Sequence, residues 1–533
     1  MQKKSVRALI ISAVFILGML LQGCVPFSSL LTPPSSGHKV AYIPLDNRPV
    51  NQERVYYLAK SAGIELLMPD EILYRTALDN MQANPDGSTT GNREKLCQWL
   101  LDADAHCDYF IISLDQMTSG GLVGSRWFSN EDLTLEYGII DTVLSLGTTN
   151  TIYLFDTVMR LAPTVGYQGY QLAEYTALRA YGMNPRKTLL GEDLTVEKII
   201  EAYTCAPNGE PIDTDVPKDL LTQHLAARTR KLKLIDYTLR KAERDIDFFY
   251  IGADDSSPQN TIQTNEINYI TSLMGPNGVL GAATDEIAVC CLARMISQIY
   301  DVKVPLQVTY FGNGEKQPAD SFDIGTLEES IQTHYDALSL KTANKETSPL
   351  QVLCLTRGSS DTDRASLLSQ ISDNQARHIP TVLIDVSEDP KQFAEGLLTA
   401  PTVDICQLLG YSSWNTAANA IGLALSQGVA RYAYLSAVGN ASQEANNGFL
   451  QALTFSYIKD ISYKCFHPSL DGFASYKHPC SAESILKRIN NGRIITSADY
   501  LLKQHSNVSV SNYHYPWNRT FEMCFDIHLS ESR

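Results

Sequence analysis

Short apolar runs alternate with longer stretches of mixed apolar and polar residues along most of the chain. The apolar runs have the length and residue types of buried strands, and the mixed stretches have the spacing of helices. The runs that we interpret as strands are Val40–Leu45, Tyr109–Leu114, Thr151–Phe155, Phe248–Ile251, Leu306–Phe311, Gln351–Leu355, Thr381–Ile384 and Val403–Leu409, with Glu65–Met68 as a weaker ninth. The helix-like stretches are Asn51–Ala62, Arg93–Ala103, Tyr170–Tyr181, Gln223–Arg244, Asp285–Ile299, Gly325–Leu338 and Asp363–Asn374. This alternation predicts the α/β class, with a parallel sheet covered by helices on both faces.

The number and spacing of the runs allow two architectures. Eight main strands are typical of a (β/α)-barrel, which is the arrangement we expect. The ninth run and the wide gap between Phe155 and Phe248 also fit two doubly wound units in series. We assign residues 39–427 to the α/β domain, with a possible division near residue 300. The strand pattern then fades, so residues 428–533 are predicted to form a C-terminal extension of helices and a final aromatic segment.

The first residues have the pattern of a targeting signal. A basic start precedes the apolar run Ala8–Leu21, which is short for a membrane span. The run ends in Leu21-Gln22-Gly23-Cys24, which resembles a bacterial lipobox. We predict a signal peptide over residues 1–23, lipid attachment to Cys24 and a tether over residues 24–38. The protein would then be anchored at the extracytoplasmic face of the cell membrane, and an ordinary signal peptide or a short anchor helix is the alternative.

Charge excludes one class of partner. The 533 residues include 43 Lys and Arg against 59 Asp and Glu, which gives a net charge of −16. A protein this acidic repels the phosphates of nucleic acids, so we expect no nucleic-acid partner. The sequence leaves the oligomeric state open.

The cysteines do not have the spacing of a metal site. The chain contains no CxxC motif and no Cys/His cluster with zinc spacing, so we expect no structural zinc site. The leading hypothesis below calls for no metal and no cofactor. Export would allow disulfides to form. Two pairs are close enough in sequence to be candidates, Cys97 with Cys107 and Cys465 with Cys480.

Polar residues gather where the predicted strands end. In either architecture the loops at the carboxyl ends of parallel strands form the ligand site. The candidate site residues are Asp46, Arg48, Asp115, Gln116, Arg126, Asp156, Arg160, Asp254, Asp255, Trp414, Asn415 and Asn419. Acids, arginines, amides and an aromatic ring are suited to a polyhydroxylated ligand. Helix caps and internal ion pairs are the alternative roles for these side chains.

The candidate residues lead to a specific geometric prediction. We expect one common cleft to be lined by Asp46, Arg48, Asp115, Arg126, Asp254, Asp255, Trp414 and Asn415.

The adjacent acids Asp254 and Asp255 favour a glycoside hydrolase as the leading hypothesis. Glycosidic cleavage needs one carboxyl group as proton donor and a second to stabilise or attack the oxocarbenium-like centre. The pair also resembles that of substrate-assisted hexosaminidases, which would make Asp255 the acid and Asp254 the residue that orients an N-acetyl group. The expected partner is a carbohydrate or cell-wall glycan. The histidines lie mostly away from the strand ends, which disfavours a Ser-His-Asp hydrolase.

Two other functions remain open. The first is a lipoprotein that binds glycan or cell-wall fragments without cleaving them. The second is a hydrolase that depends on a divalent metal, with Asp46, Asp115, Asp156 and Asp254 as oxygen ligands.

Several stretches also resemble a known bacterial family, the domain of unknown function 4127. They are Ile43–Asn51, Gly120–Arg126, Gly281–Arg294, Trp414–Gly422 and Pro516–Glu522, and the resemblance runs from about Val40 to Phe525. It implies membership of a family and carries no established reaction. The chain departs from the family pattern at Ser413, where Gly is expected, and over Phe449–Tyr463, which lacks an expected acidic pair.

Overall fold

The computed structural model describes residues 37–79, 81–85, 87–242, 246–343, 348–466 and 478–530. The predicted signal peptide and most of the predicted tether, including Cys24, lie outside these residues. From residue 37 on, the described chain belongs to one compact unit. No helix within the described ranges is long and apolar enough to cross a membrane.

The first half of the chain forms a parallel sheet of six strands. In chain order these are β1 (Lys39–Ile43), β2 (Glu65–Leu67), β3 (Tyr109–Ser113), β4 (Thr151–Val158), β5 (Phe248–Ala253) and β6 (Gly278–Ala282). Their order across the sheet is β2-β1-β3-β4-β5-β6, and every pair is parallel. All residues of β5 are buried, as its continuous apolar sequence requires for a strand covered on both faces.

The second half forms a separate parallel sheet of five strands. They are β7 (Pro305–Phe311), β8 (Lys341–Thr342), β9 (Leu350–Leu355), β10 (Thr381–Asp385) and β11 (Leu408–Ser412). Their order is β11-β10-β9-β7-β8, again with parallel pairs.

Both sheets follow the same winding rule. In each, the first strand lies inside the sheet, the second strand lies on one side of it, and the later strands follow on the other side. This is the order of flavodoxin-like doubly wound folds, which bind ligands where the winding direction reverses. The α/β class with parallel strands is therefore confirmed. The expected closed barrel is wrong, because the described strands form two open sheets in series.

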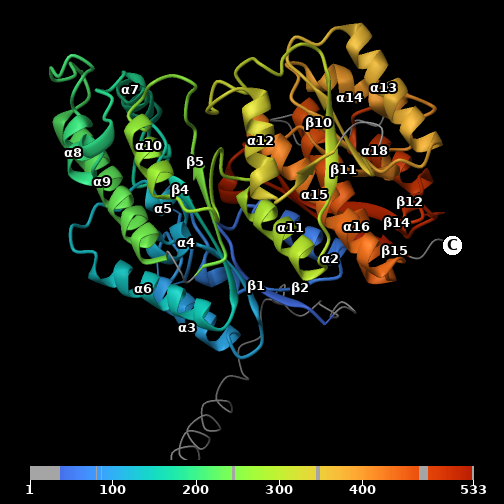
Figure 1. Ribbon diagram of the computed structural model, residues 1–533, viewed down its shortest axis with the longest axis horizontal. Coiled ribbons are helices and arrows are strands. Elements are labelled where there is room, and N and C mark those ends of the chain that lie inside the picture. Colours follow the sequence, from blue (N-terminus) through green and yellow to red (C-terminus); the bar gives the residue numbers. More distant parts are fainter. Residues whose placement is uncertain are drawn as a thin grey trace, which may run out of the picture. The chain divides into compact units, whose positions relative to one another are not determined.

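Helices from both halves of the chain lie between the sheets (Figure 1). They are α2 (Glu53–Ser61), α11 (Ile287–Ile299), α12 (Leu327–Ala337), α15 (Ala417–Val438) and α16 (Gln443–Tyr457). Helix α11 packs on β4 and β5 and against α15, which covers β10 and β11. Small residues allow this close approach, since a Cβ atom at Gly428 would lie 2.1 Å from Val382 Cγ2. One continuous hydrophobic core therefore joins the two sheets.

The other helices cover the outer faces and the loops. On the first sheet, α3 (Arg93–Ala103), α6 (Thr134–Ser145), α9 (Lys218–Lys241) and α10 (Thr264–Leu273) enclose a second core. The second half adds α13 (Asp361–Ala376) and α14 (Pro390–Thr399). The first half also contains α4 (Leu114–Ser119), α5 (Leu122–Ser125), α7 (Leu172–Met183) and α8 (Val196–Ala202).

The C-terminal part contains both helices and strands. Helix α15 crosses the expected boundary at residue 428, and α16 continues into a π-helix, Ile458–Tyr463. Then follow α17 (Lys464–Phe466), α18 (Ala482–Asn491) and two antiparallel pairs: β12 (Ile494–Ile495) with β13 (Leu502–Lys503), and β14 (Asn507–His514) with β15 (Cys524–Ser530). The expected loss of strands is wrong here, because β14 is a half-exposed strand with a largely polar sequence.

Candidate active site

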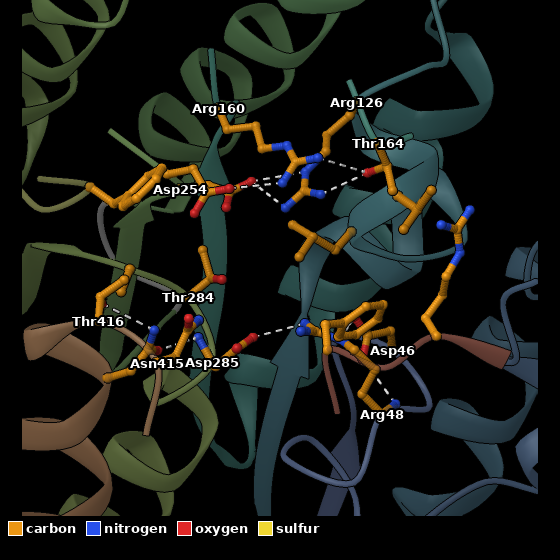
Figure 2. Close-up of a pocket in the computed structure, with 18 of the residues that line it drawn as sticks. Asp46, Arg48, Arg126, Arg160, Thr164, Asp254, Thr284, Asp285, Asn415 and Thr416 are labelled. Carbon is orange, nitrogen blue, oxygen red and sulfur yellow. Dashed lines mark hydrogen bonds and ion pairs between the residues drawn. The ribbon is translucent and has the colours of Figure 1, made fainter. Parts of the chain in front are cut away.

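A pocket of about 350 Å³ lies at the carboxyl ends of both sheets. Loops after β1, β3, β4, β5 and β6 of the first sheet and after β7 and β11 of the second contribute to it, as does the C-terminal stretch Trp517–Phe521. The candidate residues that line it are Asp46, Arg48, Arg126, Arg160, Asp254, Asp255, Asn415 and Asn419. The lining therefore combines residues that lie hundreds of positions apart in the sequence, as expected for loops at the carboxyl ends of parallel strands (Figure 2).

Two arginines neutralise the adjacent acids. Arg126 donates through Nε and Nη2 to Asp254 Oδ2, at 2.9 and 2.5 Å (Figure 2). Arg160 donates through Nη1 to Asp255 Oδ2 at 2.8 Å. Burial raises the pKa of Asp254 despite the charge of Arg126. Burial alone would also raise the pKa of Asp255, but the charges of Arg160 and Arg126 outweigh it and lower that pKa. Asp255 is therefore ionised at neutral pH.

A second ion-paired group forms another part of the lining. Arg48 Nε donates to both oxygens of Asp46, at 3.1 and 3.0 Å, and its Nη2 donates to Asp285 Oδ1 at 2.8 Å. The guanidinium also lies 5.8 Å from the centre of the Trp517 ring, whose Nε1 donates to Asn47 Oδ1. This contact holds the aromatic face of Trp517 at the pocket.

Asp323 differs from the other acids of the lining. Its carboxyl group has no exposed surface, its Oδ2 accepts from the backbone N–H of Ala418 in the first turn of α15, and its Oδ1 has no partner. No lysine or arginine pairs with it within the described residues. Burial raises the pKa of Asp323 to about 7, and the nearby charge of Asp255 adds to the rise. The residue lies well beyond the end of β7, so a search of strand ends does not find it.

Strained backbone is concentrated in the same lining. Four residues other than glycine have positive φ angles there: Asp255 at 34°, Ala283 at 62°, Asn415 at 58° and Trp517 at 53°. Such conformations cost free energy, and they persist at sites where the direction of a side chain matters for function.

Four candidate residues do not line the pocket. Asp115 and Asp156 are buried against the ammonium group of Lys231 from α9, with 2.5 Å between Lys231 Nζ and Asp115 Oδ1. Gln116 is buried, with no hydrogen bond to its side-chain amide. The Trp414 ring lies 4.4 Å from Lys459 Nζ.

The expected common cleft is therefore wrong for Asp115 and Trp414, and Trp517 supplies an aromatic ring at the pocket instead. Asp115 and Asp156 face Lys231 in the interior and not the pocket. Their buried carboxylates need a counter-charge, and the lysine supplies it.

The acids considered as metal ligands are engaged with cations. Asp46 pairs with Arg48, Asp254 with Arg126, and the other two with Lys231. An arginine or lysine at hydrogen-bonding distance opposes a metal ion at the same oxygen. In the described part of the chain, the group with metal-ligand spacing is Glu395, His478 and Cys480, none of which lines the pocket.

Fold and site together define an α/β protein of two doubly wound sheets that share one pocket with charged, amide and aromatic residues in its lining. The sequence matches the family described as "Protein of unknown function (DUF4127)" over residues 40–526, and the chain belongs to this family. No curated protein and no solved structure matches the chain. All five stretches that carry the family resemblance contribute residues to the pocket lining, which makes this pocket the candidate active site.

Proposed function

We propose that the protein is a carbohydrate-active enzyme, a glycoside hydrolase that acts at this pocket. The supporting observation is the contrast between Asp323 and Asp255, two carboxyl groups in one lining with opposite pKa shifts. One acid, which has no cation beside it, keeps its proton up to a pH of about 7, while the other is held ionised by Arg160. Glycosidic cleavage requires such a pair.

The opposite pKa shifts support different catalytic roles for the two residues. Asp323 donates its proton to the glycosidic oxygen as the bond to the leaving sugar breaks. Asp255 stabilises the positive charge that develops at the anomeric carbon, and water adds to that carbon and gives up a proton to a carboxylate. These roles differ from those inferred from the sequence, because the arginine beside Asp255 keeps that residue from acting as the acid at neutral pH. Asp254, paired with Arg126, remains the orienting residue of the proposal.

The other lining residues support a sugar as the substrate. Tyr175, Phe322, Trp517 and Phe521 supply aromatic surface, and Asn415 and Asn419 supply amide groups. Sugar rings pack their apolar faces on aromatic rings, and their hydroxyl groups pair with amides and charged groups. A neutral or N-acetylated sugar of a cell-wall glycan fits this lining.

The location proposed for the enzyme follows from the start of the sequence. A lipid on Cys24 would anchor the protein at the extracytoplasmic face of the membrane, where cell-wall glycan is accessible.

The first prediction tests both carboxyl groups with a panel of glycans and aryl glycosides. The purified variants Asp323→Asn and Asp255→Asn are each expected to lose about 10²–10⁴-fold in kcat on unactivated glycans. Aryl glycosides with a good leaving group need no proton, so they should restore turnover by Asp323→Asn but not by Asp255→Asn. The wild-type rate should fall as the pH rises through about 7, because Asp323 then loses its proton.

The control variant is Glu201→Gln, which changes a side chain that is 66% exposed. It should keep wild-type turnover. Full turnover by both pocket variants would remove the catalytic assignment. Glycan affinity without product would instead favour the binding lipoprotein.

A further inference from the structure

A second, smaller pocket lies at the carboxyl ends of the second sheet. Its volume is about 40 Å³, and we call it the side pocket. The loops after β7, β9, β10 and β11 contribute Asp320, Arg357, Ser387 and Ser413 to its lining, among other residues. Doubly wound sheets bind ligands at this edge. The second sheet therefore has a cavity of its own where its fold favours a ligand.

The side pocket adjoins the candidate active site. Asn415 and Thr416 line both cavities. One loop also contributes to both, since Asp320 lines the side pocket while Phe322 and Asp323 line the larger one. Asp323 is the proposed donor of a proton to the leaving sugar, so the side pocket lies on the side of the site where that sugar would be held.

Two opposite charges of the side pocket have no close partner. Asp385 is 2% exposed; its Oδ1 accepts from the backbone N–H and the hydroxyl of Ser387, at 3.0 and 2.6 Å, and its Oδ2 has no partner. Lys464 is half-buried, and its ammonium group makes no hydrogen bond or ion pair with the residues that the structure describes. Burial raises the pKa of Asp385 and lowers that of Lys464, as expected for charges without a close partner.

The other charged residues of the side pocket pair with each other. Arg357 donates through Nη2 to Asp320 Oδ2 at 2.6 Å. The four charges of the lining therefore cancel, and the cavity offers one acceptor, Asp385 Oδ2, and one donor, Lys464 Nζ. A buried polar atom without a partner is costly, and in native proteins it often marks the place of a bound water, ion or ligand.

The chemistry of the two groups is suited to an amide. An amide N–H can donate to Asp385 Oδ2, and an amide oxygen can accept from Lys464 Nζ. An anion would be repelled by the carboxylate and a cation by the ammonium group, so a neutral group is favoured. A volume of about 40 Å³ admits only a small substituent, because one water molecule needs about 10–15 Å³.

We propose that the side pocket binds the acetamido group of the leaving sugar, which makes the substrate a glycan of N-acetylated amino sugars. This inference rests on the proposed function and names the substrate class of the same site. The amide N–H of the acetamido group donates to Asp385, its oxygen accepts from Lys464, and the sugar ring extends from the side pocket toward Asp323.

The second prediction compares two trisaccharides that differ in one substituent. Chitotriose carries an acetamido group on C2 of each sugar, and cellotriose carries a hydroxyl group there. Calorimetry measures their affinities for Asp323→Asn, in which turnover should be slow, and chitotriose should bind more tightly. Adding Asp385→Asn or Lys464→Met should reduce this preference about tenfold, because each removes one hydrogen-bond partner of the amide. Asparagine keeps an oxygen for Ser387 but presents an NH2 group to the ligand.

The control is Lys503→Met in the same background, which changes an exposed lysine elsewhere and should keep the preference. Should Asp385→Asn not fold, Lys464→Met still decides, since no described residue is paired with that lysine. Equal affinity of Asp323→Asn for the two trisaccharides, or a preference that is unchanged in both added variants, would overturn the assignment of the side pocket.

Failure of the proposed hydrolase gives a different result. If the wild type releases no product but the preference for chitotriose depends on Asp385 and Lys464, the side pocket is supported and the hydrolase is not. If the wild type cleaves chitotriose and cellotriose equally well, the hydrolase is supported and the side pocket is not.

Discussion

The charge of a single carboxyl group distinguishes Asp323 from the other acids of the pocket. Asp46, Asp254, Asp255 and Asp285 each accept from an arginine. Asp323 has only a backbone N–H and a buried position. The folded protein therefore holds a proton on Asp323 that the unfolded chain releases, and this difference links its protonation to stability.

The third prediction concerns the stability of Asp323→Asn. The folded-state pKa of about 7 is above the ordinary value of 3.8, so the wild type loses stability as the pH rises from about 4 to 7. Asparagine cannot ionise, so the variant should gain stability over the wild type, and the gain should grow by about 2 kcal/mol between pH 5 and pH 8. Urea denaturation at the two pH values measures this. An exposed control, Asp361→Asn, should show no such growth, and an equal effect of Asp323→Asn at both pH values would contradict the assignment.

Individual residues of the pocket also differ in whether the sequence alone could locate them. Asp46, Arg48 and Asp254 were predictable because they follow strands directly and the chain there turns along the sheet edge. Asp323 was not, because a long loop separates it from β7 and only the folded chain brings it to the lining. Its burial next to the start of α15 is a tertiary property with no local sequence pattern.

At the scale of elements, helix α9 determines which strand-end acids reach the pocket. Its Arg228 pairs with Glu266, its Arg230 with Glu136, and its Lys231 with Asp115 and Asp156. The helix was predictable from its spacing of apolar residues, but these pairings were not, because Lys231 lies 116 and 75 positions from its two partners. A strand-end acid therefore looks the same in sequence whether it faces a ligand or a helix.

The fourth prediction follows from this arrangement. Lys231→Met leaves Asp115 and Asp156 buried without a cation, which is expected to destabilise the fold by about 3–5 kcal/mol at pH 8. The cost should be smaller at pH 5. Burial raises the pKa of Asp156 to about 7 even beside Lys231, and without the lysine that pKa rises further, so stability is lost as the pH rises through it. Denaturant unfolding at both pH values tests this, with Lys233→Met on the exposed face of α9 as the control. A loss of less than about 1 kcal/mol in the free energy of unfolding at pH 8 would show that the buried charges of Asp115 and Asp156 do not depend on the lysine.

At the scale of the whole molecule, the sequence pattern did not determine how the sheets close. A barrel and two doubly wound sheets share the same alternation of strands and helices, and they differ in which strands pair at the edges. The deciding facts are that β2 and β6 are the edges of the first sheet and that α11 and α15 pack between the sheets. Strand β6 has the sequence Gly-Val-Leu-Gly-Ala, whose glycines weaken any strand pattern, so it was not predicted.

Segments near the two ends of the described chain also contact each other. Glu522 Oε1 accepts from the backbone N–H of Val50, 472 positions away, at 2.8 Å, and it also pairs with Lys459 of the π-helix. Glu522 and Lys459 have no exposed surface, and burial lowers the pKa of Lys459 well below its ordinary value. This ion pair joins the loop after β1, the π-helix and the stretch that carries Trp517 and Phe521.

The fifth prediction is that Glu522→Gln destabilises the protein by about 3–5 kcal/mol near pH 6, because Lys459 then stays buried without its acid. The cost should decrease toward pH 9. A lysine whose folded-state pKa is lowered destabilises the fold at low pH, and this effect is relieved as the lysine loses its proton. Adding Lys459→Met to Glu522→Gln should recover part of the loss, since the unpaired charge is then absent. Urea denaturation of the single and double variants measures the coupling, with the exposed Glu483→Gln as control. Strictly additive costs for the two substitutions would mean that the ion pair does not hold the chain ends together.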